Sequence, residues 1–259
     1  MAWDDLSEKL SIPTNMRLLL LLEEVAETGV PVTPTEVNSR LGLPKPTVHR
    51  LFATLEEAGF LQRDIDGRSY SPGRRLRRMS VNVLSCLRIR AARLAVLNAL
   101  ANEVGETCNV ATPDRDAMIY LDRVETKWPL RIQLPIGTSV PLHCTASGKM
   151  YLSSLQPSHL EQYLNAAPLE SRTEKTITDP LVLTTMLQTI KEQGFSTDDA
   201  EFMDSMVACA VPILDGRGRL VSTLSIHAPT LRMSLQDMKA HVPLMHETAA
   251  KLTKLIMED

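Results

Sequence analysis

The chain has 259 residues, of which 44% are hydrophobic and 23% are charged, and this composition excludes a mainly disordered protein. No apolar run approaches the roughly 20 residues that cross a bilayer, and no export signal opens the sequence. The four cysteines are scattered, without the spacing of a zinc ribbon or a disulfide framework, which favours a reducing cytoplasm.

The charge is distributed unevenly along the chain. The net charge is −3, but residues 40–93 hold 12 Lys or Arg against 4 Asp or Glu, whereas residues 91–259 hold 15 against 20. A basic region of this kind indicates a polyanionic partner such as nucleic acid. A basic surface without a partner is the alternative at this point.

The first predicted helix begins near Thr14, which can cap it, and ends at Gly29. Two of its faces are apolar at helical spacing, and they comprise Leu18, Leu21, Leu22 and Val25 on one side and Met16, Leu19 and Leu20 on the other. Such a helix must bury both faces, either because one contacts a partner subunit or because the helix lies deep in a core.

Two short helices follow, predicted over Pro34 to Leu41 and Lys45 to Ala58, with a tight break that contains a glycine. This pattern is typical of a helix-turn-helix, in which the second helix enters the major groove of DNA. Only the first turns of that helix reach the edges of the bases. The chain places Lys45, Thr47 and Arg50 there.

A hairpin is predicted next, with strands over residues 60–65 and 68–71 and the two-residue turn Asp66-Gly67. Arg63 and Arg68 make this hairpin basic. A basic hairpin directly after a candidate recognition helix is expected to be a wing that contacts the phosphate backbone or the minor groove.

The remaining chain predicts a linker helix and a second domain. Residues 73–88 form the basic linker helix, whose arginines either approach DNA or are solvated. Residues 89–259 form an α+β domain, an antiparallel sheet with helices packed against it. Its strands are predicted over 108–112, 118–124, 130–134, 207–214 and 220–227, and its helices over 89–104, 146–155, 158–166, 180–193 and 234–257. The winged helix-turn-helix domain then covers residues 1–72.

Four motifs in this chain resemble the isocitrate lyase regulator (IclR) family. The run Leu43-Pro-Lys-Pro-Thr-Val-His-Arg-Leu, followed by Leu55-Glu-Glu-Ala-Gly-Phe-Leu, resembles the winged helix of that family. Three later runs resemble blocks of its effector domain, in the expected order: Val140-Pro-Leu-His-Cys-Thr-Ala-Ser-Gly-Lys149, Gly194-Phe-Ser-Thr-Asp-Asp-Ala-Glu201 and Ala210-Val-Pro-Ile-Leu-Asp215. The resemblance covers residues 12 to 257.

The resemblance implies a bacterial transcription factor, more often a repressor, that acts as a homodimer or a dimer of dimers on palindromic double-stranded DNA. Its C-terminal domain would be GAF-like and bind a small carboxylic acid, with no cofactor and no metal. The DNA-binding residues carried over are Lys45, Thr47, His49, Arg50, Arg63 and Arg68. Pro46 stands where the family usually has a serine and removes one hydrogen bond to phosphate. For His49, a purely surface position is the alternative.

The resemblance also implies an effector site between the sheet and the helix that begins near Ala146. The backbone N–H groups of Ala146 and Ser147 would face a carboxylate at the positive end of that helix. The other carried-over positions are Trp128, Ile132, Val140, Asp198, Ala208, Ser225 and His227. The family often has a cysteine at the position of Ala208, whereas Cys209 is shifted by one and is predicted to face the other side of its strand.

Two of these positions bear on the size of the effector. His227 replaces a serine-like residue, which suggests a bulkier ligand than the smallest keto acids. Trp128 is expected to act as a lid. Asp198 has a second interpretation, because it could simply cap a turn.

Phosphate-loop, nucleophilic and metal chemistry all lack their usual sequence patterns in this chain. The run Ala146 to Lys149 lacks both the glycine of a phosphate loop and the spacing of a Ser-x-x-Lys nucleophile. A metal site assembled from His143, Cys144, Cys209 and His227 has no standard zinc spacing. Two alternatives remain open: an enzyme with an appended DNA-binding domain, and a DNA-binding subunit whose second domain only oligomerises.

Overall fold

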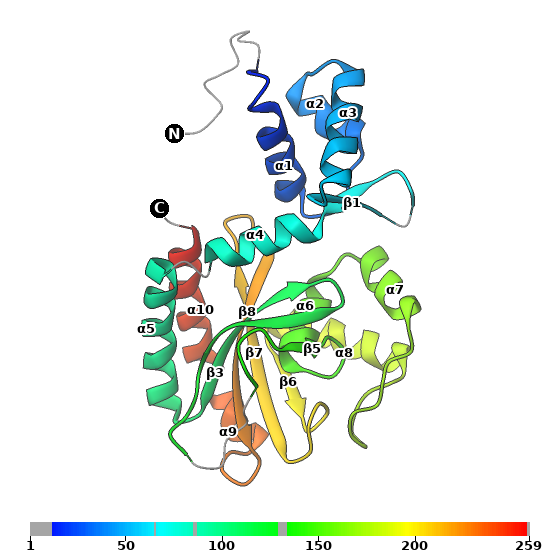
Figure 1. Cartoon of the computed structure of the whole chain (residues 1–259). Helices are drawn as coiled ribbons and strands as arrows, with labels where there is room; N and C mark the ends of the chain where they lie inside the picture. Colours follow the sequence, from blue (N-terminus) through cyan, green and yellow to red (C-terminus); the bar gives the residue numbers. More distant parts are fainter. Residues whose placement is uncertain (1–11, 65, 85–86, 129–133, 258–259) are drawn as a thin grey trace. The chain divides into compact units, whose positions relative to one another are not determined.

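The computed structural model describes residues 12–64, 66–84, 87–128 and 134–257, and the chain divides into two compact units, Met1–Val83 and Leu84–Asp259 (Figure 1). We call them the N-terminal unit and the C-terminal unit. The N-terminal unit contains α1 (Arg17–Thr28), α2 (Pro34–Leu41), α3 (Lys45–Glu57), β1 (Leu61–Arg63), β2 (Tyr70–Pro72) and α4 (Arg74–Leu84), which ends at the boundary. The C-terminal unit contains α5 (Leu87–Val104), β3 (Thr107–Asp114), β4 (Ala117–Val124), β5 (Ser139–Pro141), α6 (Ala146–Ser154), α7 (Pro157–Ala166), α8 (Pro180–Gln193), β6 (Ser196–Asp199), β7 (Met206–Leu214), β8 (Leu220–Pro229), α9 (Leu235–Ala240) and α10 (Val242–Met257).

The helix-turn-helix is confirmed, and local hydrogen bonds explain its sharp break. The Thr33 side chain accepts the Glu36 N–H while the Glu36 carboxylate accepts the Thr33 N–H, so a capping box opens α2. Gly42 ends that helix in the left-handed region, with φ of +63°. The Asn38 side chain then bonds both the N–H and the C=O of Leu43, at 2.9 and 2.8 Å, and holds the turn before α3.

The first helix begins later than the sequence predicts. A turn precedes α1, and Met16 stands at its N-cap, where the side chain has no oxygen that could cap the helix. The predicted cap at Thr14 is therefore wrong. Leu21 and Val25 are fully buried, whereas Leu19 is 58% exposed. Met16 and Leu20 are half-buried, so the described part of this chain covers the second apolar face only in part.

The hairpin forms, but with shorter strands than predicted. Its two strands pair antiparallel, with Leu61 opposite Pro72 and Arg63 opposite Tyr70. The predicted two-residue turn is wrong, because the connection runs from residue 64 to residue 69, of which Ile65 lies outside the described residues. The Asp66 carboxylate accepts the N–H groups of Arg68 and Ser69, both at 2.8 Å, and stabilises this wider loop.

The C-terminal unit is built on one antiparallel sheet with the strand order β5-β4-β3-β8-β7-β6, which confirms the α+β class. The predicted hairpin of β7 and β8 forms, and Ala210 lies opposite Ser225. Two edge strands, β5 and β6, were not predicted, because each has only three or four residues. Of the strand predicted over 130–134, only Leu134 is described, and it is not in a strand.

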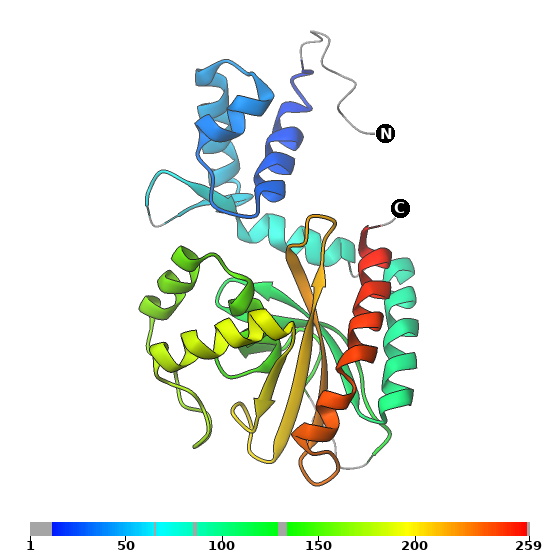
Figure 2. The same ribbon diagram turned by 180° about the vertical axis from the view of Figure 1, so that it is seen from behind.

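Helices cover both faces of this sheet. On one face, α5 and α10 lie side by side and α9 contacts β7, and on the other face α6 contacts β6, β7 and β8 while α8 packs on α6 (Figures 1 and 2). On the first face, Asp122 of β4 accepts hydrogen bonds from Arg90 and Arg93 of α5 at 3.0 and 2.7 Å. The α6 face carries the large apolar core.

The helix ends of the C-terminal unit follow their capping residues. Asp179 caps α8 and Gly194 ends it with φ of +76°, as predicted. The single final helix predicted over 234–257, with a kink at Pro243, is divided into two helices close to that proline. Ser234 opens α9 with the predicted capping box, but the helix stops at His241, and Pro243 stands in the first turn of a second helix, α10. Since proline cannot donate the N–H that a continuing helix requires, the break falls there.

Candidate functional site

The predicted base-reading residues share the outer face of α3. Lys45, His49 and Arg50 are exposed and Thr47 is half-buried. The opposite face of the helix carries the side chains that form the core of the N-terminal unit, namely Val48, Phe52 and Leu55. The amphipathic pattern therefore leaves two cations and an imidazole exposed, and a hydroxyl half-exposed, in the first two turns of the helix.

The first turn of α3 is also suited to an anion. Pro44 is the N-cap residue, and its side chain has no acceptor for the first amides. These amides form the positive end of the helix dipole, which attracts phosphate. Pro46 lies in the same turn and has no N–H to contribute.

In the wing, the two predicted arginines differ in their contacts. Arg63 donates to the Glu56 carboxylate at 2.8 Å and to the Gly67 carbonyl at 3.0 Å, and its guanidinium stacks 4.8 Å from the centre of the Tyr70 ring. It therefore fastens the wing to α3, and it lowers the pKa of Glu56. Arg68 lies on the exposed loop of the wing.

The arginines of α4 are divided in the same way. Arg75 stacks on Phe60 at 4.6 Å, and Arg77 donates to the Pro72 carbonyl. Both side chains therefore contact residues next to or within the wing, although Arg75 is exposed, as are Arg74 and Arg78, while Arg77 is half-buried. Gly73 allows this close packing, since a Cβ at Gly73 would lie 2.5 Å from the carbonyl oxygen of the glycine that follows α3.

In the C-terminal unit, strand register gathers polar residues on the α6 face of the sheet. Across five strands, Arg123 lies opposite Asn109, which lies opposite Ser225, then Ala210 and then Ser196. Directly opposed residues point to the same face of a sheet. The Ser196 hydroxyl donates to the backbone carbonyl of the first residue of α6 at 2.6 Å, which identifies that face.

A second cross-strand row lies beside the first. In it, His227 of β8 lies opposite Ala208 of β7, which lies opposite Asp198 of β6. The structure thus brings four of the predicted effector residues together beneath α6. We call the buried residues Asn109, Arg123, Asp198, Thr223, Ser225 and His227 the polar sheet face.

The start of α6 is fixed above this face. Thr145 is its N-cap and accepts the Gly148 N–H at 3.0 Å, while its own hydroxyl donates to the Pro141 carbonyl at 2.7 Å. Gly148 is required here, because a Cβ would lie 2.3 Å from the Leu142 carbonyl oxygen. The capping by Thr145 leaves the amides of the first two residues, Ala146 and Ser147, at the positive end of the helix.

Several buried polar atoms in this region have no hydrogen-bond partner among the described residues. They are Asn109 Nδ2, Ser147 Oγ, Asp198 Oδ2, Glu201 Oε2, Thr223 Oγ1 and His227 Nδ1. Each unsatisfied buried polar group costs about 1–3 kcal/mol, so a folded protein seldom keeps several together without a reason. A polar ligand that supplies partners to these atoms is such a reason.

Burial sets the protonation of the polar sheet face. It raises the pKa of Asp198 to about 7, against the opposing effect of the Glu201 N–H, which donates to the carboxylate at 2.7 Å. Burial, aided by the charge of Arg123, lowers the pKa of His227 to about 3. The imidazole is therefore neutral at physiological pH, and its Nε2 lies 3.0 Å from the Ser225 hydroxyl.

The sequence reasoning missed Asn109, Arg123 and the buried ion pair between Lys149 of α6 and Glu201. Arg123 and Asn109 are joined by a hydrogen bond of 3.0 Å. The sequence does contain one signal for Asn109 and Arg123, because both are polar residues within otherwise apolar strands. The runs are Cys-Asn-Val and Leu-Asp-Arg-Val. Because a β-bulge shifts the register of β4 against β3, simple alternation does not predict which of Asp122 and Arg123 faces α6.

The remaining predicted effector residues do not lie in these two rows, and one of them lies outside the described residues. Trp128 is 54% exposed and contacts the guanidinium of Arg232, 5.8 Å from its ring centre, and Arg232 in turn pairs with Glu106. Val140 is buried on β5 and contributes to the core beneath α6. Ile132 lies outside the described residues.

The suggested metal site does not assemble. Cys209 alternates with Ala208 and Ala210, so its side chain points away from α6 and from His227, as predicted. The His143 ring is bonded to the Glu170 carbonyl at 2.8 Å. In the part of the chain that the structure describes, no three His, Cys, Asp or Glu residues are placed to hold a metal ion.

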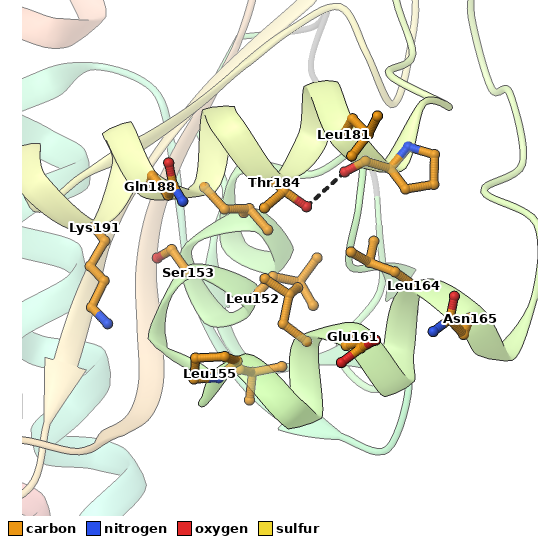
Figure 3. A pocket seen from close by; sticks show the side chains of 14 residues that line it. Leu152, Ser153, Leu155, Glu161, Leu164, Asn165, Leu181, Thr184, Gln188 and Lys191 are labelled. Atoms are coloured by element: carbon orange, nitrogen blue, oxygen red, sulfur yellow. Dashed lines mark hydrogen bonds between the residues drawn. The ribbon is translucent and has the colours of Figure 1, made fainter.

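A separate pocket of about 460 Å³ lies among α6, α7 and α8 (Figure 3). Leucines supply most of its walls, including Leu152, Leu164 and Leu187, and Thr184 donates to the Pro180 carbonyl at its rim, at 2.7 Å. None of the predicted effector residues lines it. The pocket is therefore distinct from the polar sheet face.

Known proteins share both units. Residues 81–254 match the bacterial transcriptional regulator IclR C-terminal domain, and residues 16–64 match the IclR helix-turn-helix domain. The chain is 34% identical to the probable transcriptional regulator SauR of Cupriavidus necator, over 94% of this chain and 96% of that protein. It is 28% identical to the HTH-type transcriptional regulator KdgR of Escherichia coli, over 91% of this chain and 88% of that protein.

Solved structures agree with these matches. The crystal structure of the Thermotoga maritima IclR superposes with a TM-score of 0.62 at 26% identity, covering 93% of this chain and 97% of that chain. In the described ranges, no helix is long and apolar enough to cross a membrane. The helix-turn-helix match comes first in the chain and the C-terminal domain match follows it, without overlap. The chain therefore belongs to the IclR family of bacterial transcriptional regulators.

Proposed function

We propose that this regulator represses transcription at a palindromic operator and that a small carboxylic acid controls its binding to DNA. Its family makes the chain a DNA-binding transcriptional regulator with a C-terminal effector domain, and not an enzyme. The proposal goes beyond the family in three respects: repression as the sign of regulation, a palindromic operator, and a carboxylic acid as the effector.

The exposed cationic turns of α3 support the DNA-binding part of the proposal. Lys45, Thr47 and Arg50 would read base edges or contact phosphates from the first turns, and His49 lies on the same surface. Arg68 would contact the backbone from the wing. Arg63 is held by Glu56 and would act mainly by keeping the wing in place, with its guanidinium as a second basic group.

The single observation that carries the effector proposal is the set of unpartnered buried polar atoms beneath the start of α6. A carboxylate would accept hydrogen bonds from the amides of Ala146 and Ser147 at the positive end of the helix. The protonated form of Asp198 would donate to the same ligand. The other proposed contacts are Val140, Ala208, Ser225 and His227, with Trp128 as a lid and Ile132 as a further wall residue.

We assign the functions by segment as follows. Residues 1–72 bind DNA, residues 73–88 link the domains, and residues 89–259 bind the effector, in a homodimer or a dimer of dimers in the cytoplasm. A dimer matches a palindrome because each half-site receives one recognition helix, about one DNA turn or a multiple apart. The acid must bind one arrangement of the dimer more tightly than another, since equal affinity shifts no equilibrium.

The test is fluorescence anisotropy of the full-length protein with the DNA upstream of its own gene, with and without a panel of small carboxylic acids. We expect specific binding that one acid changes and that Arg50→Ala weakens. Arg172→Ala, an exposed arginine of the C-terminal unit paired with Glu170, is the matched control and should leave DNA binding unchanged. Specific binding that no acid alters would contradict the effector part and favour a second domain that only oligomerises.

A further inference from the structure

We infer that the effector carries a second anionic group and that Asn109 and Arg123 bind it at the end of the polar sheet face farthest from β6. This inference rests on the proposed function, because it takes the first carboxylate to lie at the start of α6. It adds a chemical requirement on the ligand, namely two oxyanions at a fixed separation.

The first support is the geometry of the Arg123–Asn109 pair. Both residues are buried, Asn109 completely, and the Arg123 guanidinium donates to Asn109 Oδ1 at 3.0 Å. This bond fixes the orientation of the amide, so Asn109 Nδ2 must point elsewhere. The Nδ2 atom finds no acceptor within the described residues. A ligand oxygen that accepts from this amide would satisfy it.

The second support is the contrast between the two ends of the polar sheet face. At the β3–β4 end, the buried groups are the guanidinium of Arg123 and the amide of Asn109, and the neutral ring of His227 lies on the neighbouring strand β8. At the β6 end lie the carboxyl groups of Asp198 and Glu201, with Lys149 paired to Glu201. Hydrogen-bond donors therefore predominate at the end occupied by Asn109 and Arg123, which favours an oxyanion there.

Three other ionisable groups lie near this end, and one of them, Glu125, pairs with Arg123 and offsets part of its charge. Tyr120 of β4 lies with its ring centre 6.0 Å from that of His227, and burial raises the pKa of its hydroxyl, so it stays neutral. Asp122, the neighbour of Arg123, points to the opposite face and is held by the arginines of α5. Glu125 contacts Arg123 from the half-exposed rim at 3.3 Å.

The third support is the spacing between the two ends. Asn109 lies on β3 and Asp198 on β6, three strand steps away, which corresponds to roughly 14 Å along the sheet. Between them, β7 contributes only the methyl groups of Ala208 and Ala210, and β8 contributes Ser225 and His227. After a hydrogen bond of about 2.9 Å at each end is allowed for, an acid of about four to six carbon atoms would span the distance.

The test compares monocarboxylates with dicarboxylates of equal chain length, using isothermal titration calorimetry on the full-length protein. The pairs are butyrate and succinate, pentanoate and glutarate, and hexanoate and adipate. We expect a dicarboxylate to bind about 10-fold to 100-fold more tightly than its partner at one of these lengths, because a buried hydrogen bond to a charged group discriminates strongly.

Two variants locate the second anion. Asn109→Asp keeps the side-chain volume and the acceptor for Arg123 but removes the amide donors and adds negative charge. It should abolish the preference for the dicarboxylate, because it should weaken binding of the dicarboxylate much more than binding of the monocarboxylate of equal chain length. Arg123→Lys keeps the charge but not the fork geometry and should lose part of the preference. Arg172→Gln is the exposed control, and melting curves establish that each variant is folded.

The outcomes separate this inference from the proposed function. If monocarboxylates bind and no dicarboxylate binds more tightly, the second anion is wrong while the carboxylate sensor stands. If Asn109→Asp weakens both series equally, Asn109 contacts the first carboxylate or supports the fold, and the assignment is wrong. If neither series binds, the carboxylate part of the proposed function fails with it.

Discussion

The two units of this protein differ in the burial of their functional side chains, which are mostly exposed in the N-terminal unit and buried in the C-terminal unit. In the N-terminal unit, the predicted DNA contacts lie on the exposed face of α3 and on the wing, outside a small apolar core. In the C-terminal unit, the candidate effector contacts are buried between α6 and the sheet. Exposed positions that make no contact within their unit can change at little cost to the fold, whereas changes in the buried site also affect stability.

The largest expected effect tests the buried side of this comparison. Lys149→Met leaves Glu201 buried without its partner and should lower the free energy of unfolding by about 3–5 kcal/mol, as measured by chemical denaturation. The double variant Lys149→Met/Glu201→Leu removes both charges and should recover most of that loss. If the single variant is as stable as the double variant, Glu201 does not need Lys149 as a partner. The expected contrast in stability between the buried site and the exposed site would then be wrong.

The exposed side predicts a smaller effect of a different kind. Arg50→Ala should weaken operator binding by about 1–3 kcal/mol if Arg50 reads a base, while the melting temperature stays unchanged. Anisotropy titrations and thermal melting of the same samples check both statements. Unchanged affinity would remove Arg50 from the reading surface, and a lowered melting temperature would place it in the fold instead.

This difference also explains how much the sequence could predict. The N-terminal unit was predictable almost residue by residue, because capping residues and glycines fix α2 and α3 locally and exposure follows from helical periodicity. The errors there, at Thr14 and in the wing turn, come from side chains: Met16 occupies the cap position, and Asp66 bonds forward along its loop.

In the C-terminal unit, class and most elements were predictable but the composition of the site was not. The position of Asn109 beneath α6 depends on the register of four strands, and that of Arg123 depends on a β-bulge. Neither is encoded in local sequence. The edge strands β5 and β6 are too short for alternation to appear, although β6 supplies Asp198.

A pH-dependent prediction tests the burial of Asp198. Because its pKa is raised in the folded state, the stability that it contributes is fully present below the unfolded pKa and is lost as the pH rises through about 7. Asp198→Asn keeps the acceptor for the Glu201 N–H and does not titrate. Relative to this variant, the natural protein should lose about 2 kcal/mol of unfolding free energy between pH 5 and pH 8.

Denaturation curves of both proteins at the two pH values measure this difference, and the other titrating groups cancel in the comparison. A constant difference between pH 5 and pH 8 would contradict a carboxyl group that is protonated near neutrality. It would also weaken the proposal that Asp198 donates a hydrogen bond to the effector.

The smallest expected effect concerns the wing, where the exposed and the engaged arginine can be compared directly. Arg68→Ala should leave the melting temperature unchanged and reduce the slope of log affinity against log salt by about one, because one phosphate contact is lost. Arg63→Ala should instead lower the melting temperature, since its guanidinium bonds the Glu56 carboxylate and the Gly67 carbonyl. Anisotropy titrations at several salt concentrations and thermal melting separate the two. If both variants change only the salt slope, the contacts of Arg63 within the wing do not hold it in place, and both arginines belong to the exposed surface that binds DNA.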